Sequence, residues 1–239
     1  MSDERSEART RANREVILTR AIEAFAEDGF QDADVQMIAE KAGVGYGTVY
    51  RYFRTKEKLF WSATYVVLER LGAHVRESIS QCRGAIEALR AAGLAYVGFF
   101  EANPECLAVF VESHAEFHGH IPPLHRDFHE KIVQSFVETL ERGIAEGDIR
   151  PLDARSIVIS LGCVLYGVVM FGCYVEDQYT ISELAKQALD IFLGGIEPSP
   201  DKIIITLGDG NSTNTRSGTT ASANDPQFQR LPPVGASEK

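Results

Sequence analysis

The chain has 239 residues, 44% of them hydrophobic, so it is long enough to bury a substantial core. Its formal net charge of −10 argues against a wholly basic nucleic-acid coat protein, because nonspecific phosphate binding depends on the number of cations presented. Residues 1–60 carry 10 Lys and Arg against 11 Asp and Glu, whereas residues 61–239 carry 14 against 23, so a polyanion is expected to meet the N-terminal part.

Apolar residues recur at helical spacing over residues 1–195, and no alternating pattern between hairpin turns appears there. The fold is therefore predicted to be all-α, with about nine helices. Capping residues and Gly or Pro breaks set their expected ends. The predicted helices span residues 11–28, 35–42, 46–52, 56–82, 84–102, 104–118, 121–146, 153–176 and 180–195.

Three residues give the clearest local signals for helix ends. Gly29 follows the first predicted helix and is expected to end it, because glycine readily adopts the left-handed backbone of that position. Asp34 and Thr55 precede the second and fourth predicted helices, where their side chains can accept hydrogen bonds from the first turn.

The stretch VQMIAEKAGVGYGTVYRYF, residues 35–53, places three glycines between two short amphipathic helices. Two helices that meet at a sharp angle need a small residue at their contact, a positive φ at the corner, and apolar residues that lock the pair. Ala39 and Gly43 meet the first two needs. The locking residues are Ile38, Val44 and Val49. This order predicts a helix-turn-helix, although a glycine-containing loop in a helical bundle is the simpler alternative.

In a helix-turn-helix, the second helix enters the major groove of DNA by its N-terminal end, where bulky side chains would hold it away. Gly45 and Gly47 are expected to let the backbone approach the DNA, while Tyr46 and Thr48 reach the edges of the bases. The residues suited to phosphate contacts are Tyr50, Arg51, Tyr52 and Lys56.

Three arginines, Arg9, Arg11 and Arg14, precede or open the first predicted helix. One interpretation is a basic arm that contacts the adjacent minor groove or phosphates. The other is a solvated, frayed terminus, because acidic residues alternate with these arginines. The sequence favours neither, and Arg11 is included among the candidate DNA contacts.

The stretch IAEKAGVGYGTVYRYFRTKEKLF resembles the DNA-binding signature of the tetracycline-repressor (TetR) family, and the match extends over residues 11–60. Gly45 departs from the Ser, Ala or Lys often found there. The resemblance implies a homodimer, held together by the last two long helices of each chain, and a ligand cavity among the middle helices. It also implies base contacts from Tyr46 and Thr48 and phosphate contacts from Tyr50, Tyr52 and Lys56.

Aromatic residues are frequent in the acidic part of the chain from 61 to 195, where an effector is expected to bind. Core packing explains each of these side chains equally well. The candidate ligand-binding residues are Tyr96, Phe99, Phe100, Phe110, Phe117, Tyr166, Met170 and Phe171.

Histidines form a second candidate site in ESHAEFHGHIPPLHRDFHEK. His114 and His118 are four residues apart, as are His125 and His129, so each pair would share one face of its helix. If the turn between them brought the pairs together, they could hold zinc or another divalent metal. The alternative is a set of surface or interhelical polar residues beside a loop.

Three further features concern location and domain organisation. Residues 156–175 are uncharged and long enough to span a bilayer, but their serines, glycines and tyrosines favour a core or subunit-interface helix. The polar N-terminus does not resemble a signal peptide, and the four cysteines lack metal-site or disulfide spacing, so a soluble cytoplasmic protein is expected. Residues 197–239 are rich in Ser, Thr, Asn, Gly and Pro and are expected to be disordered.

The sequence thus predicts a helix-turn-helix domain over residues 1–55 and a ligand-binding and dimerisation domain over 56–196. The predicted function is that of a transcriptional regulator, most simply a repressor, with double-stranded DNA, a small-molecule effector and a second copy of itself as partners. Its two recognition helices would enter successive major grooves about 34–36 Å apart on a palindromic operator. No cofactor, enzymatic activity or membrane is expected. The alternatives are a metal-responsive regulator and a helical-bundle metalloenzyme.

Overall fold

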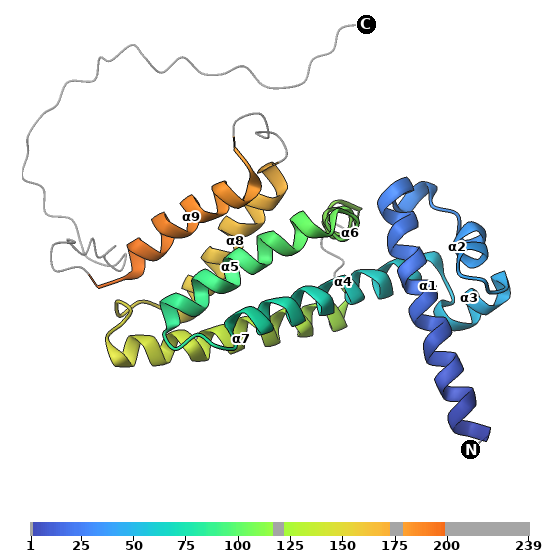
Figure 1. Cartoon of the computed structure of the whole chain (residues 1–239), viewed down its shortest axis with the longest axis horizontal. Coiled ribbons are helices and arrows are strands. Elements are labelled where there is room, and N and C mark those ends of the chain that lie inside the picture. The colour runs from blue at the N-terminus through green and yellow to red at the C-terminus, as the bar shows by residue number, and fades with distance from the viewer. Residues whose placement is uncertain (1, 117–121, 173–178, 199–239) are drawn as a thin grey trace, which may run out of the picture. The chain divides into compact units, whose positions relative to one another are not determined.

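A computed structural model describes residues 2–116, 122–172 and 179–198, and side chains for all of these except residues 2–6 and 116 (Figure 1). The regular elements in these ranges are α-helices, which confirms the all-α prediction. They are α1 (Ser2–Asp32), α2 (Val35–Lys41), α3 (Tyr46–Phe53), α4 (Lys56–Ile79), α5 (Ala85–Ala102), α6 (Pro104–Glu116), α7 (Pro123–Glu146), α8 (Ala154–Gly172) and α9 (Ile181–Ile196). Residues 199–239 lie outside the described part, so the disordered tail and the domain boundaries stay predictions.

The predicted capping residues are at the helix ends. The Gln36 N–H donates to Asp34 Oδ1 over 2.7 Å at the start of α2, and the Lys58 N–H donates to Thr55 Oγ1 over 3.1 Å at the start of α4. Gly29 has φ 75° and ψ 171°, which interrupts the helical backbone of α1 three residues before its end. These local signals therefore place α1, α2 and α4 in the order that the sequence predicts.

The first helix is longer than predicted, because it begins at Ser2 and not near residue 11. Apolar periodicity, from which the start of the helix is predicted, begins only near residue 11. Residues 2–10 contain two Glu, two Arg and one Ala, which favour helix through intrinsic propensity without needing an apolar face. The helical N-terminus is thus evidence against the interpretation of residues 9–14 as a frayed end.

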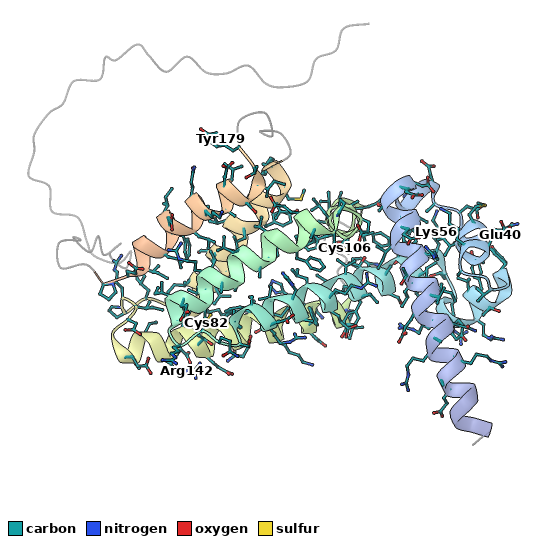
Figure 2. The ribbon with its side chains drawn as sticks, viewed as in Figure 1. Glu40, Lys56, Cys82, Cys106, Arg142 and Tyr179 are labelled. Carbon is teal, nitrogen blue, oxygen red and sulfur yellow. The ribbon has the colours of Figure 1, made fainter. Side chains whose placement is uncertain are left out.

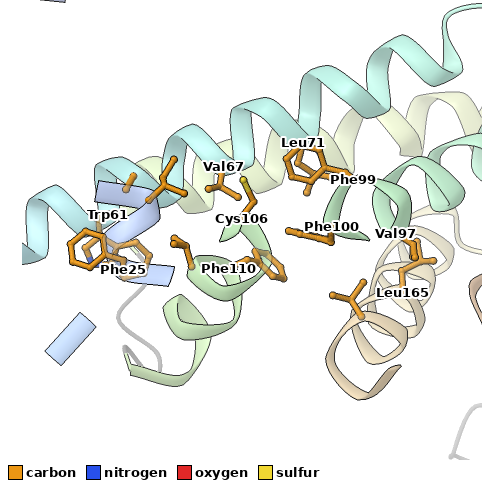
Figure 3. Close-up of a cluster of buried hydrophobic side chains, with 14 of the residues drawn as sticks. Phe25, Trp61, Val67, Leu71, Val97, Phe99, Phe100, Cys106, Phe110 and Leu165 are labelled. Atoms are coloured by element: carbon orange, nitrogen blue, oxygen red, sulfur yellow. The ribbon is translucent and has the colours of Figure 1, made fainter. Parts of the chain in front are cut away.

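Helix α4 joins the N-terminal bundle (α1–α3) to the body (α5–α9), because it packs on α1 and α3 and also on α5 and α6. Leu59 and Phe60 near its start are fully buried, and the Phe60 ring meets Phe25 of α1 edge-on with centroids 5.1 Å apart. Further along, Val67 and Leu71 belong to the same hydrophobic core. Figure 3 shows this core continuing from Phe25 and Trp61 to Leu165.

Helix α8 is apolar on two opposite faces. Its inner face buries Ile157, Leu161, Leu165 and Val169. By length and hydropathy α8 could cross a membrane, and α5 with α6 form a second candidate only as a pair bent by 104°. Only 28% of the apolar window of α8 is buried within the chain, so much of its surface needs a further cover.

A polar side chain in the described part of the body is buried without a hydrogen bond. His125, in the first turn of α7, is 6% exposed, and neither ring nitrogen has a hydrogen-bond partner. Its ring meets those of Trp61 and Tyr65 of α4 edge-on, with centroids 4.8 and 5.7 Å away. Burial lowers the pKa of His125, because the imidazolium form would lose its water; the nearby Trp61 backbone offsets part of this effect.

We expect His125 to make folding sensitive to acid. In the unfolded chain the imidazole gains a proton near its ordinary pKa of about 6.5, whereas in the folded chain it stays neutral to a lower pH. The unfolded state then binds more protons, so the free energy of unfolding falls as the pH decreases below about 6.5. Thermal unfolding between pH 7.5 and 5 should show a shallower decline for His125→Phe than for the wild type.

The matched control is His129→Asn, which removes an exposed histidine from the same helix. Its unfolding temperature should depend on pH as that of the wild type does. Equal slopes for the wild type and His125→Phe would contradict this role of His125.

Candidate nucleic-acid interface and effector site

The corner between α2 and α3 has the geometry that its sequence predicts. Gly43 has φ 67°, a left-handed conformation that side chains with a Cβ rarely adopt. The Gly43 N–H donates to the Glu40 carbonyl and the Val44 N–H to the Ala39 carbonyl, each over 3.0 Å. These bonds end α2 and turn the chain sharply into α3.

Buried side chains fix α3 against the rest of the N-terminal bundle. Ile38 and Ala39 of α2 and Val49 of α3 are almost fully buried, as is Phe53 at the end of α3. Val44 is only partly buried but packs against this core. One face of α3 is therefore held in place, and its opposite face is turned to solvent.

The solvent face of α3 carries tyrosine rings that contact each other. The Tyr46 side chain is half exposed, and its ring lies 4.7 Å from that of Tyr50. The hydrogen bond between their hydroxyls is the main cause that raises the pKa of Tyr50, and burial adds to it. Thr48 is partly exposed beside them, so the predicted base-reading residues lie together at the leading turn of α3.

Gly45 and Gly47 lie on this face, and the fold itself requires glycine at neither position. Gly45 is the N-cap of α3 with φ −70°, a conformation open to any residue. A Cβ added to Gly45 would meet only Thr48 Oγ1, 3.9 Å away, and one added to Gly47 would meet nothing within 4 Å. The absence of side chains thus leaves open space over the start of α3.

The predicted phosphate-binding residues are arranged differently from one another. Arg51 lies with its guanidinium 5.6 Å from the Tyr52 ring centroid. Lys56 lies beside α1 (Figure 2), where Nζ donates to the Gln31 carbonyl over 2.8 Å and lies 5.4 Å from the Phe30 ring centroid. Lys56 therefore contributes to the packing of α1 on α4, a role that the sequence did not indicate.

The arginines at the start of α1 also have distinct places. Arg11 is exposed on the helix surface. Arg14 places its guanidinium 5.6 Å from the centroid of the Phe53 ring at the end of α3. The cationic part of α1 therefore borders the recognition helix.

Several predicted effector residues form one aromatic cluster between α5, α6 and α8. The Phe100 ring lies 5.3 Å from Tyr96, 5.4 Å from Phe99 and 5.0 Å from Phe110. Phe110 in turn lies 6.1 Å from Tyr166. Burial is the main cause that raises the pKa of Tyr96, and the nearby Tyr166 adds to it, so the Tyr96 hydroxyl stays a neutral donor.

The remaining candidate effector residues differ in how exposed their side chains are. Met170 is partly buried, whereas the Phe171 side chain is 67% exposed, so the prediction that Phe171 lines a cavity is wrong within this chain. Phe117 lies outside the described residues.

The predicted metal site is not supported by the described histidines. His114 contacts Phe110 and Tyr166, while His125 is buried against Trp61 and Tyr65 of α4. Within residues whose positions are described, no group of three or more His, Cys, Asp or Glu side chains could hold a metal ion. Helix α6 thus directs His114, and helix α7 directs His125, to different aromatic partners. His118 lies outside the described residues.

Helix α6 contacts the N-terminal bundle through a carboxylate, a role that the sequence did not indicate. Glu112 of α6 accepts a hydrogen bond from the Phe30 N–H, just after the break in α1. The two residues are 82 positions apart, so no local pattern indicates their contact.

The comparisons with known proteins agree with this geometry. Residues 17–63, which include the corner and α3, match the family described as bacterial regulatory proteins, tetR family. The fatty acid metabolism regulator protein of Bacillus subtilis is 25% identical over 187 residues, which cover 75% of this chain and 93% of the relative. The transcriptional repressor KstR2 of Mycobacterium tuberculosis is 27% identical over 192 residues, 75% of this chain and 90% of the relative.

A solved structure is similar over the same length. The transcriptional regulator FadR of Bacillus subtilis, in complex with stearoyl-CoA, aligns with a TM-score of 0.64 and 23% identity. The alignment covers 76% of this chain and 98% of that one, so the likeness includes the body as well as the N-terminal bundle. Residues 17–63 therefore match the DNA-binding domain of the tetR family, and the chain is similar to TetR-family transcriptional regulators along three quarters of its length.

Proposed function

We propose that this protein is a transcriptional repressor that binds double-stranded DNA as a homodimer and is released by a small, mainly apolar effector. The observation that carries the proposal is the open space over Gly45 and Gly47. Glycine inside a helix lowers stability by about 0.5–1 kcal/mol relative to alanine, and at Gly47 the open space lies on the exposed face of α3, beside Tyr46 and Thr48. Close approach of the α3 backbone to DNA requires such open space.

The residues around this space suit DNA. Tyr46 and Thr48 present hydroxyl and methyl groups that can meet base edges, and Arg51 supplies a cation beside them. The proposed contacts also include two arginines of α1: Arg14, which borders the end of α3, and Arg11, which is exposed on the helix surface. The Lys56 ammonium group still has N–H donors for a phosphate after it bonds the Gln31 carbonyl, so it can bind α1 and DNA at the same time.

The outer face of α8 supports the homodimer. Ile159, Cys163 and Phe171 are exposed, and they recur every four or eight residues along one side of the helix. Nothing lies within 4 Å of a Cβ added to Gly162 or Gly167, so a second helix can approach closely. On α9, Ile191 is 79% exposed. A second copy of the same face would cover this uncharged surface, and the protein would then be soluble in the cytoplasm.

The aromatic cluster supports an apolar effector. Its walls are rings, and its polar groups are the hydroxyls of Tyr96 and Tyr166, so it offers area for an acyl chain or ring system and few sites for charge. The FadR relative was solved with stearoyl-CoA, which has such an acyl chain. Because the rings contact each other, a ligand must displace them, and this movement can reach α4, which packs on α5, α6 and the N-terminal bundle. The effector must prefer the displaced state in order to lower DNA affinity.

The Gly47→Ala variant tests DNA binding by α3. We expect the free energy of unfolding to rise by about 0.5–1 kcal/mol, because alanine favours helix. DNA affinity should nevertheless fall by about tenfold or more, because a displaced recognition helix loses base contacts worth about 1–3 kcal/mol each. Fluorescence anisotropy with DNA fragments from upstream of the gene, together with urea unfolding, measures both quantities.

Gly98→Ala is the matched control, because Gly98 is also a helix glycine with nothing within 4 Å of an added Cβ, but it lies in α5. It should stabilise the chain and leave DNA affinity unchanged. If Gly47→Ala bound DNA as tightly as the wild type, α3 would not be the reading helix.

The Ile159→Glu variant tests the dimer. A buried carboxylate in the proposed interface should convert the dimer to a monomer, which sedimentation velocity can detect, and should weaken DNA binding because the two recognition helices no longer bind together. Ser135→Glu, on the exposed face of α7, should remain a dimer. A monomeric wild type, or an undisturbed Ile159→Glu dimer, would refute this interface.

Stearoyl-CoA is the probe for the effector class. Added to the protein–DNA complex, it should release the DNA, whereas coenzyme A without the acyl chain should not. Tyr166→Ala should raise the concentration required for release, measured relative to the variant's own DNA affinity without the probe. No release at any concentration below micelle formation would exclude long-chain acyl thioesters as effectors.

A further inference from the structure

The break in α1 begins a short helical turn that lacks a cap of its own. After Gly29, residues 30–32 are helical again, and the Ala33 N–H donates to the Gly29 carbonyl over 3.1 Å. The first N–H groups of any such turn find no acceptor within it. A side-chain oxygen of the preceding residue usually accepts from them, but glycine has no side chain.

A carboxylate from the body takes this position. Glu112 Oε1 accepts from the Phe30 N–H, and it lies 3.2 Å from where a Cβ on Gly29 would be. On the other side of the turn, Lys56 Nζ of α4 donates to the Gln31 carbonyl. The end of α1 is thus held by the Glu112 carboxylate of α6, which accepts from an N–H, and by the Lys56 ammonium of α4, which donates to a carbonyl. Both are charge-assisted hydrogen bonds.

Helix α6 connects this cap to the aromatic cluster. Phe110 and His114 are four residues apart and contact Tyr166, whereas Glu112 is two residues from each and therefore points away from them on the helix. One helix of 13 residues thus has the effector cluster on one side and the cap of α1 on the other. A rotation of α6 that made room in the cluster would move the carboxylate.

We propose that Glu112 is a positioning residue, which caps α1 from α6 and holds the N-terminal bundle in its DNA-binding orientation. The proposal rests on the proposed function, since it concerns how the body controls α3. When the cluster side of α6 is displaced, the carboxylate leaves the Phe30 N–H and the end of α1 loosens. DNA affinity then falls although no DNA-contacting residue has changed.

The test compares Glu112→Ala with Glu112→Gln in the full chain. Glu112→Ala removes the acceptor and should lower DNA affinity by about fivefold, the factor that corresponds to losing one helix cap. Glu112→Gln keeps an acceptor oxygen and should restore most of the affinity. Amide hydrogen exchange at Phe30 should be faster in Glu112→Ala and close to the wild-type rate in Glu112→Gln.

Glu101→Ala is the matched control, because Glu101 of α5 likewise accepts from a backbone N–H at a distant helix start, that of Ser182, over 2.9 Å. This cap lies within the body. Glu101→Ala should therefore lower stability without changing Phe30 exchange or, where the chain remains a dimer, DNA affinity.

A double-mutant cycle separates transmission from a local packing role. Phe110→Leu should weaken DNA binding when it is introduced into the wild type. Introduced into Glu112→Ala, it should weaken binding less, because the cap through which the cluster acts on α1 is already absent. Additive effects, or wild-type affinity and Phe30 exchange in Glu112→Ala, would overturn the proposal. If the wild type bound no DNA, the proposed function would fail, and Phe30 exchange would still decide whether Glu112 is the cap.

Discussion

The burial of α4 along its length is the constraint on which the rest of the structure depends. Leu59 and Phe60 pack against α1, and Val67 and Leu71 lie further along in the same core as the body. Because protein interiors are close-packed, a displaced side chain at one end of such a core shifts its neighbours and does not simply enter empty space. The N-terminal bundle and the body therefore cannot rearrange independently, as the proposed control of α3 by an effector requires.

Glycines with two different physical roles define the N-terminal bundle. Gly29 and Gly43 have positive φ, so the backbone path itself requires them there. Gly45 has an ordinary φ and Gly47 has open surroundings, so the backbone path of the chain does not require glycine at either position. Of the four, only Gly47 lies inside an uninterrupted helix, where helix propensity disfavours glycine. Backbone angles distinguish Gly29, which interrupts α1, and Gly43, which makes the corner, from Gly45 and Gly47.

Polar side chains connect helices whose apolar contacts alone would leave their relative rotation loosely defined. Glu112 and Lys56 each bond a backbone group at the end of α1, and Glu101 does the same at the start of α9. A hydrogen bond has a narrow range of distance and angle, whereas hydrophobic contact is non-directional. These bonds therefore fix orientation more than they add stability. His125 is the opposite case, a buried polar ring without such a bond, held by aromatic contacts.

The sequence by itself determined the features that depend on residues within one helical turn: the caps at Asp34 and Thr55, the breaks at Gly29 and Gly43, and the order of small and apolar residues in the helix-turn-helix. It also placed most of the aromatic cluster, because apolar periodicity marks which helix faces turn inward. Only the tertiary structure decided that Lys56 bonds Gln31, that Glu112 caps α1, and that His114 and His125 meet different aromatic partners. Those contacts depend on how the helices rotate and cross in the packed core, and the sequence within one helical turn does not indicate that geometry.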